Sequence, residues 1–282
     1  MEKHLGLPSV IGRSKVTAFQ HIVEKVCRKL ENWKVKFLSQ AGKEILIKVV
    51  VQAIPTYSMN VFLLPRTLCN KLNSLISNFW WGTNDKTAKI HWKGWDSLSK
   101  NKVAGGLGFR DLLAFNSALL AKQVWRILKN PTALAAKVLK AAYFPNSSIL
   151  QAKVGSKPSY TRKSISLAIN TVKEGMIWRI ANGEDVKIWQ DKWIPTNNSR
   201  KVMSPIKILS SNAKVTELID PNTRWWNMQL LHDIFWIEDK QQIIRIPIAQ
   251  TTHLRDNIAW KYTSNGCFTV KSAYQLCKQR QD

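Results

Sequence analysis

Aromatic rings and cations alternate between residues 78 and 126, and this combination suits a nucleic-acid surface. Four tryptophans in this stretch lie among lysines: Trp80, Trp81, Trp92 and Trp95. Bases stack on aromatic rings, while ammonium groups hold phosphates. The alternative is a tryptophan-rich core surrounded by solvated lysines, and the sequence leaves both interpretations open.

The glycines that follow, Gly105, Gly106 and Gly108, do not form a phosphate-binding motif. A Walker loop needs a Lys and a Ser or Thr after its glycines, and a dinucleotide fingerprint needs a preceding strand and a later acidic residue. Neither pattern is present in the chain. We therefore expect these glycines to shape a turn into a helix that Asp111 caps.

The acidic residues do not suggest a catalytic site. Phosphoryl transfer with two metal ions needs carboxylates that jointly hold the ions. The adjacent acidic pairs are Glu184-Asp185, in a predicted turn, and Glu238-Asp239, near a predicted helix end. Each pair suits solvated turn or cap chemistry, so we expect no catalytic residue.

Histidine and cysteine spacing does not indicate a metal site either. The five histidines are far apart in the sequence, and His91, between Lys89 and Trp92, is the one expected to contact nucleic acid. The cysteines have no two- or three-residue spacing, which argues against a zinc site and a disulfide framework; they are Cys27, Cys69, Cys267 and Cys277. Reduced thiols fit an intracellular protein.

The elements that must position these residues are expected to be mainly helical. Apolar residues recur at spacings of three and four from Ser14 to Trp33, which predicts a helix with a basic outer face. Ser39 is expected to cap a second helix that ends at Pro55, although its run ILIKVVV also suits a strand. Pro65 is expected to begin a third helix. These three helices predict a small bundle.

The pattern changes after residue 145. Two alternating stretches, WRIANGEDVKIWQDKWIP and NIAWKYTSNGCFTVKS, turn at Asn-Gly and predict hairpins near residues 176–193 and 258–271. We predict a helical bundle at 1–82, a Trp/Lys loop with a helical connection at 83–145, and a smaller mixed region at 146–282. The expected fold class is α+β, predominantly α-helical.

Composition favours a polyanionic partner. The chain has 43 Lys and Arg against 18 Asp and Glu in 282 residues, a formal charge of +25, which exceeds what solubility requires. No apolar run approaches the roughly 18 to 20 residues needed to cross a bilayer, so we expect no membrane partner. The first residues, MEKHLGLPSV, do not resemble a targeting peptide.

Several segments carry a family resemblance in collinear order over nearly the whole chain: KHLGLPSVIGRSK, FLSQAGKEILIKVVVQAIPTYSMNVFLLP, FWWG, HWKGWDSLSKNKVAGGLGFRDLLAFNSALLAKQVWR, VLKAAYFP, WRIANGEDVKIWQDKWIP and CFTVKSAY. Together they resemble the region downstream of the polymerase palm in plant non-LTR (LINE-type) retrotransposon reverse transcriptases. They also resemble stand-alone copies of that region, often named reverse transcriptase zinc-binding domain or ribonuclease H-like proteins. The resemblance implies a reverse transcriptase thumb and connecting region ahead of a zinc-binding module.

The chain departs from this family at the sites that do chemistry. The family's polymerase site carries two adjacent aspartates on a palm that precedes this region and would use magnesium; no such pair exists here. The zinc module would begin near Phe268, and the chain stops at Asp282 before the expected Cys and His cluster. Cys267 and Cys277 are therefore poor ligand candidates, and we expect no cofactor. The nucleus is the favoured location, or the mitochondrion if the gene lies in that organelle.

The resulting expectation is a catalytically inactive reverse transcriptase fragment that binds RNA or an RNA/DNA hybrid without sequence specificity. The expected contacts come from basic helix faces and the Trp/Lys loop: Lys25, Arg28, Lys29, Lys86, Lys89, His91, Trp92, Lys93 and Lys102. Two alternatives stay open. The chain is part of an active RNA-directed DNA polymerase and ribonuclease H polyprotein that acts with missing domains, or it is a decayed open reading frame with no selected function.

Overall fold

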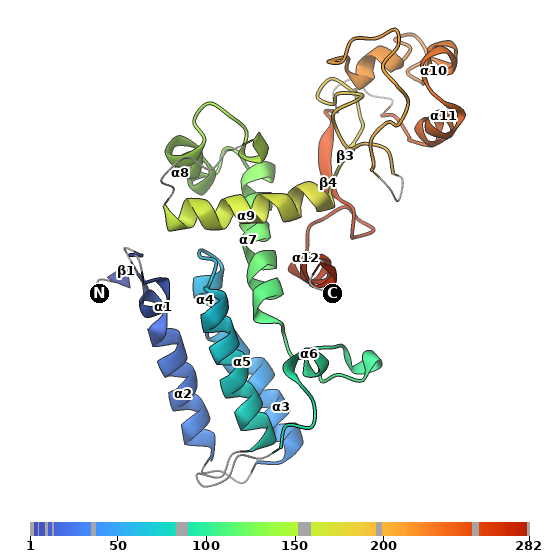
Figure 1. Cartoon of the computed structure of the whole chain (residues 1–282). Helices are drawn as coiled ribbons and strands as arrows, with labels where there is room; N and C mark the ends of the chain where they lie inside the picture. Colours follow the sequence, from blue (N-terminus) through green and yellow to red (C-terminus); the bar gives the residue numbers. More distant parts are fainter. Residues whose placement is uncertain are drawn as a thin grey trace. The chain divides into compact units, whose positions relative to one another are not determined.

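The fold is described from a computed structural model (Figure 1). It describes residues 3–4, 6–8, 11–12, 14–34, 38–82, 90–151, 159–195, 199–249 and 254–280. Contacts divide the chain into unit 1, residues 1–172 with 269–282, and unit 2, residues 173–268. Helices dominate and strands are short, so the predicted class, α+β and predominantly α-helical, is confirmed. The boundaries predicted after residues 82 and 145 remain predictions.

The first part of unit 1 is a set of helices. They are α1 (Lys15–Ala18), α2 (Gln20–Lys34), α3 (Gln40–Val49), α4 (Thr56–Met59) and α5 (Arg66–Trp81), preceded by the short antiparallel pair β1 (Lys3–His4) and β2 (Leu7–Pro8). Helix α5 packs against both α2 and α3. Ser39 caps α3 as predicted, because its side chain accepts a hydrogen bond from the backbone N–H of Gly42 at 3.1 Å.

The second part of unit 1 is arranged around α7. Its elements are α6 (Trp95–Leu98), the 3₁₀ turn η2 (Lys102–Ala104), α7 (Leu112–Lys129), α8 (Leu134–Tyr143), the 3₁₀ turn η3 (Ile149–Gln151), α9 (Tyr160–Gly175) and α12 (Val270–Gln279). Asp111 caps α7 as predicted, accepting from the backbone N–H of Ala114 at 2.8 Å. Helix α12 packs against α7, and its Tyr274 hydroxyl accepts a hydrogen bond from the backbone N–H of Asp111 at 3.0 Å.

A buried polar side chain in the core of unit 1 joins α7 to the end of α4 and the chain that follows it. Asn116 is fully buried. Its amide donates to the carbonyl oxygens of Met59 at 2.9 Å and Phe62 at 3.0 Å, and its Oδ1 accepts from the backbone N–H of Leu64 at 2.7 Å. This side chain therefore supplies the partners for three backbone groups that no helix satisfies.

Unit 2 is a small mixed unit with its own apolar core. Its strands β3 (Met176–Arg179) and β4 (Asn257–Trp260) pair antiparallel, with Met176 opposite Trp260 and Arg179 opposite Asn257. The 3₁₀ turn η4 (Val215–Leu218) and helices α10 (Met228–Ile234) and α11 (Ile237–Ile244) complete it. Its largest fully buried side chains are Trp193 and Trp260.

Strand pairing in unit 2 differs from the local hairpins predicted near 176–193 and 258–271. β3 lies in the first predicted hairpin and β4 in the second, and the two strands pair with each other. Each strand also keeps one backbone hydrogen bond within its own predicted hairpin, from Trp178 N–H to the Lys192 carbonyl at 2.7 Å and from Trp260 N–H to the Gly266 carbonyl at 2.7 Å.

Asp256, next to β4, also connects β4 to the turn after β3. Its carboxylate accepts hydrogen bonds from the backbone N–H groups of Ala181 at 2.7 Å, Gly183 at 3.0 Å and Asp185 at 2.9 Å. The turn after β3 is thereby fixed by a residue far along the chain.

Asp256→Asn is expected to destabilise unit 2 by about 2 kcal/mol, because a charge-assisted acceptor is lost. The amide oxygen of the variant can still serve Ala181 and Gly183, but its NH2 group would face the backbone N–H of Asp185. Hydrogen exchange of the three turn amides measures this, with Asp185 expected to lose most protection. Asp233→Asn, at an exposed position of α10, is the control. Equal protection in both variants would contradict the prediction.

Candidate nucleic-acid interface

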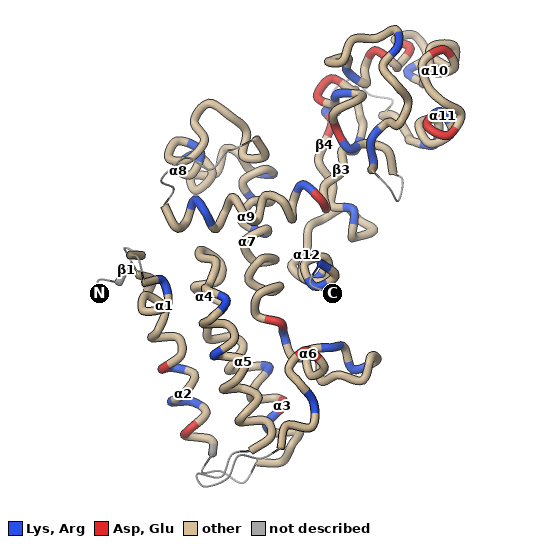
Figure 2. Tube along the Cα trace, viewed as in Figure 1, with Lys and Arg blue, Asp and Glu red and all other residues tan. Residues whose placement is uncertain are grey.

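Positive charge is concentrated in unit 1. Of the chain's 43 Lys and Arg residues, 30 belong to unit 1, against 8 of its 18 Asp and Glu residues. The remaining 13 basic and 10 acidic residues belong to unit 2, so the formal charges are +22 and +3. Figure 2 shows the charged positions along the trace. A charge of this size on one unit favours a polyanionic partner for that unit.

The basic residues predicted on α2 are exposed, but they share the helix with acids. Lys25, Arg28 and Lys29 are all exposed. Glu24 and Glu31 of the same helix are exposed too. The carboxylates reduce the local potential, so α2 is a mixed surface and a weaker phosphate site than the lysines alone suggested.

The predicted loop residues fall into two groups. Lys86 and Lys89 lie outside the described residues. His91 stacks on Trp81, with ring centroids 6.2 Å apart, and its Nδ1 lies 3.4 Å from Ser77 Oγ. Trp92 is 77 % exposed. The Trp92 ring therefore leaves a face for base stacking, whereas the His91 ring already has an aromatic neighbour.

The two remaining loop lysines already have partners in unit 1. Lys93 Nζ donates to the carbonyl oxygen of Gly105 at 3.3 Å. Lys102 Nζ lies 2.8 Å from a carboxylate oxygen of Glu44, which also binds Lys48 at 2.6 Å. Hydrogen bonds from Lys102 and Lys48 lower the pKa of Glu44. Lys102 is thus partly neutralised, and a phosphate would have to compete with a carboxylate for it.

The predicted residues that the structure describes do not lie on one surface. Figure 1 shows α2 on one side of the bundle and α6, next to the loop, on the other, with α3 and α5 between them. Of the described loop residues, His91, Trp92 and Lys93 are consecutive and share one segment. The α2 cations and the loop would therefore contact different parts of a ligand.

A polar groove of about 690 Å³ borders the loop. It is lined from α5, α6, the start of α7 and α12, and cations as well as the carboxylates of Asp96 and Asp111 are among its residues, with Asn73, Trp95 and Lys278. Asn73 Oδ1 and Trp95 Nε1 are buried and have no hydrogen-bond partner among the described residues. An adjoining hollow of about 330 Å³ shares Asn73 and Trp95 and adds His91. Both atoms are buried in the wall of the groove, so a ligand in the groove reaches neither of them without a local rearrangement.

A long basic stretch without any carboxylate was not among the predicted contacts. Residues 112–172, called the acid-free segment, contain no Asp or Glu and nine Lys or Arg: Lys122, Arg126, Lys129, Lys137, Lys140, Lys153, Lys157, Arg162 and Lys163. Lys153 and Lys157 lie outside the described residues, and the other seven are on α7, α8 and α9. The signal was readable from the sequence as a long run without a carboxylate.

The described residues hold no metal cluster and no membrane span. Among them, no three His, Cys, Asp or Glu side chains are grouped so that they could hold a metal ion. Within the same residues, every helix is too short or too polar to span a membrane. Of the four cysteines, Cys267 is exposed and Cys277 is buried. Burial also raises the pKa of Cys69 to about 12.

Comparison with known proteins finds similarity to plant proteins. No protein-family model matches it. Over 143 residues it is 43% identical to the uncharacterized mitochondrial protein AtMg00310 of Arabidopsis thaliana, covering 50% of this chain and 93% of that protein. The chain belongs to the family of this mitochondrial protein.

A second, longer relative is similar to almost the whole chain. Over 273 residues the chain is 27% identical to the putative ribonuclease H protein At1g65750 of Arabidopsis thaliana. The match covers 96% of this chain and 44% of that relative, so the chain spans less than half of its length. Relatives with these names are typical of plant open reading frames derived from retrotransposons.

Proposed function

We propose that the chain binds RNA or an RNA/DNA hybrid without sequence specificity, through phosphate contacts made by unit 1. In this proposal it corresponds to the thumb and connecting region of a non-LTR reverse transcriptase, leading into the reverse transcriptase zinc-binding domain, and has no catalytic activity of its own. The observation that carries the proposal is the segregation of charge, +22 on unit 1 and +3 on unit 2.

The acid-free segment is the main phosphate-binding surface in this proposal. Lys122, Arg126, Lys129, Lys137, Lys140 and Lys163 are all exposed. Because the segment has no carboxylate, each phosphate meets cations without competition from an acid of that segment. Contacts to phosphates fix position but carry no sequence information, which is why the expected binding is non-specific.

The Trp/Lys loop is the second contact. Trp92 exposes most of its ring, and Lys93 follows it directly in the sequence. An exposed ring beside a cation can stack on a base while the ammonium holds the neighbouring phosphate. The similarity to a putative ribonuclease H protein supports RNA-containing ligands as the first to be tested.

A filter-binding titration of the full chain at two ionic strengths tests the proposal. With about six phosphate contacts, affinity for duplex RNA or hybrid should fall roughly a thousandfold between about 50 and 200 mM salt. Absence of binding at the lower ionic strength would refute nucleic-acid binding. Metal-dependent polymerisation or hybrid cleavage by the purified protein would instead support an active enzyme. Absence of a cooperative thermal transition by circular dichroism would support a decayed reading frame.

A further inference from the structure

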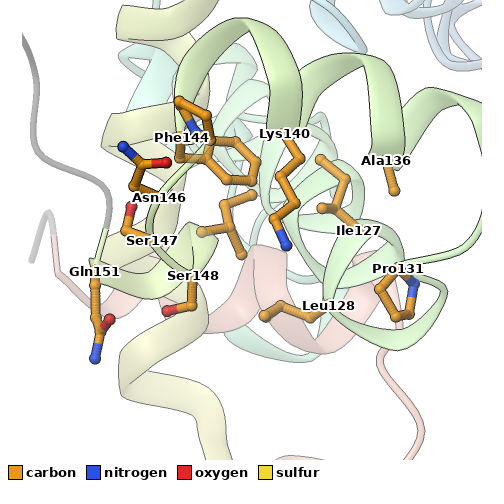
Figure 3. A pocket seen from close by; sticks show the side chains of 12 residues that line it. Ile127, Leu128, Pro131, Ala136, Lys140, Phe144, Asn146, Ser147, Ser148 and Gln151 are labelled. Carbon is orange, nitrogen blue, oxygen red and sulfur yellow. The ribbon is translucent and has the colours of Figure 1, made fainter.

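A hollow of about 530 Å³ opens in unit 1 at the end of α7 (Figure 3). Buried apolar residues from α7, α8 and the chain around η3 line it: Ile127, Ala136, Phe144 and Ile149. Its volume is within the usual range of small-molecule sites, roughly 300 to 1,000 Å³. The apolar lining can therefore accept a flat ring system of moderate size.

Polar side chains line one side of this hollow. Asn146, Ser147 and Ser148 follow α8, and Gln151 ends η3. In Figure 3, Lys140 extends from α8 into the hollow, between these polar residues and the apolar side chains of Ile127 and Leu128. The hollow is thus formed where α7, α8 and the chain around η3 meet, and α8 supplies both Lys140 and part of the apolar lining.

The electrostatics of the hollow favour an anionic ligand. All of its lining residues belong to the acid-free segment, so none of them is a carboxylate. Lys140 is the cation among them. An amide such as that of Asn146 or Gln151 offers a donor and an acceptor, the combination that pairs with the edge of a nucleobase. A plain apolar ligand would use neither the amides nor the ammonium group.

We propose that this hollow holds one unstacked nucleotide of a single-stranded segment of the bound nucleic acid. The base lies on the apolar lining beside Phe144, the amides of Asn146 and Gln151 contact its edge, and Lys140 contacts its phosphate. Proteins read RNA largely through bases that are splayed out of single strands and held against side chains. The inference rests on the proposed function and adds a preference for single strands, because a base-paired nucleotide cannot enter the hollow.

Two variants and a matched control test the assignment. Fluorescence anisotropy of the full chain is measured with a labelled single-stranded RNA, with its duplex, and with a single strand of abasic sugars. The variants are Lys140→Gln and the double change Asn146→Ala with Gln151→Ala. Lys137→Gln is the control, because Lys137 is exposed on the same helix and does not line the hollow.

The double variant is expected to bind the single strand about tenfold more weakly, in line with the loss of the hydrogen bonds to one base edge, and the duplex within about twofold of the parent. Lys140→Gln should weaken the single strand more than Lys137→Gln does. In the parent chain, the abasic strand should bind about tenfold more weakly than the normal strand. In the double variant, the difference in affinity between the normal and the abasic strand should be smaller, because the base contacts in the hollow are weakened. The difference that remains would come from stacking on Trp92.

The outcomes separate this inference from the proposed function. Salt-dependent binding with equal losses on single strand and duplex would overturn the nucleotide site and leave the proposed function standing. The nucleotide site would also be overturned, and the proposed function left standing, if the affinity difference between the normal and the abasic strand were the same in the double variant as in the parent. No binding of any nucleic acid by the parent chain at low salt would overturn both. A circular dichroism melt of each variant confirms that it folds like the parent.

Discussion

Asn116→Ala is expected to lower the free energy of unfolding of unit 1 by about 4 kcal/mol, because three buried backbone groups lose their partners. In the folded chain these are the carbonyl oxygens of Met59 and Phe62 and the N–H of Leu64. Each unsatisfied buried group costs roughly 1 to 3 kcal/mol, and the shorter side chain also leaves a cavity. Urea unfolding followed by far-ultraviolet circular dichroism, which reports mainly on the helices of unit 1, measures the loss.

Asn170→Ala provides the matched control. Asn170 is exposed on α9, so its replacement should change the free energy of unfolding by less than about 0.5 kcal/mol. If the Asn116 and Asn170 variants unfold at the same urea concentration, Asn116 does not join α7 to the chain after α4 in the way described. A changed slope of the unfolding free energy against urea concentration, with an unchanged midpoint, would also contradict this role of Asn116.

Replacing Lys122, Arg126 and Lys129 together by glutamine is expected to weaken nucleic-acid binding about a hundredfold at low salt. The plot of log affinity against log salt should lose about three units of slope, because three counterions fewer are released. All three residues are exposed on α7. Filter binding of duplex RNA over a range of salt concentrations gives both quantities.

Two further triple variants serve as comparisons for this prediction. Glutamine at Lys207, Lys214 and Arg245, which are exposed in unit 2, should leave the slope nearly unchanged. Glutamine at Lys25, Arg28 and Lys29 should have an intermediate effect, because α2 also carries Glu24 and Glu31. A larger loss from the α2 variant than from the α7 variant would move the main phosphate surface to α2.

Local features of the fold could be predicted from the sequence because their signals are local. Ser39 and Asp111 stand directly before apolar periodic runs, and each caps its helix through the backbone N–H three residues later. Pairing of β3 with β4 could not be predicted in this way. The two strands are more than seventy residues apart, and Asp256 binds the turn after β3 across a similar separation. An Asn-Gly pair reports only on its immediate neighbours.

The candidate site was predictable in part for a similar reason. Trp80 and Trp92 have the same residue type in the same stretch, yet Trp80 is 9% exposed and Trp92 is 77% exposed. Tertiary packing decides between core and surface, and the local pattern does not report it. The acid-free segment was different: its charge was visible in the sequence, but the predicted contacts came from α2 and from the tryptophan-rich stretch before α7. The hollow at Lys140 forms where three elements meet in the folded chain, so no local sequence pattern predicts it.

The position of α12 has a consequence for how the protein is made. Unit 1 ends with this helix, whose buried residues Ala273, Leu276 and Cys277 belong to an element that packs against α7. A ribosome must therefore translate the whole of unit 2 before the last helix of unit 1 emerges. Until then, a nascent chain exposes apolar surface of α7 that the finished protein covers. Chains released before residue 270 would lack α12 and keep this surface exposed, which would make them substrates for chaperones and proteases.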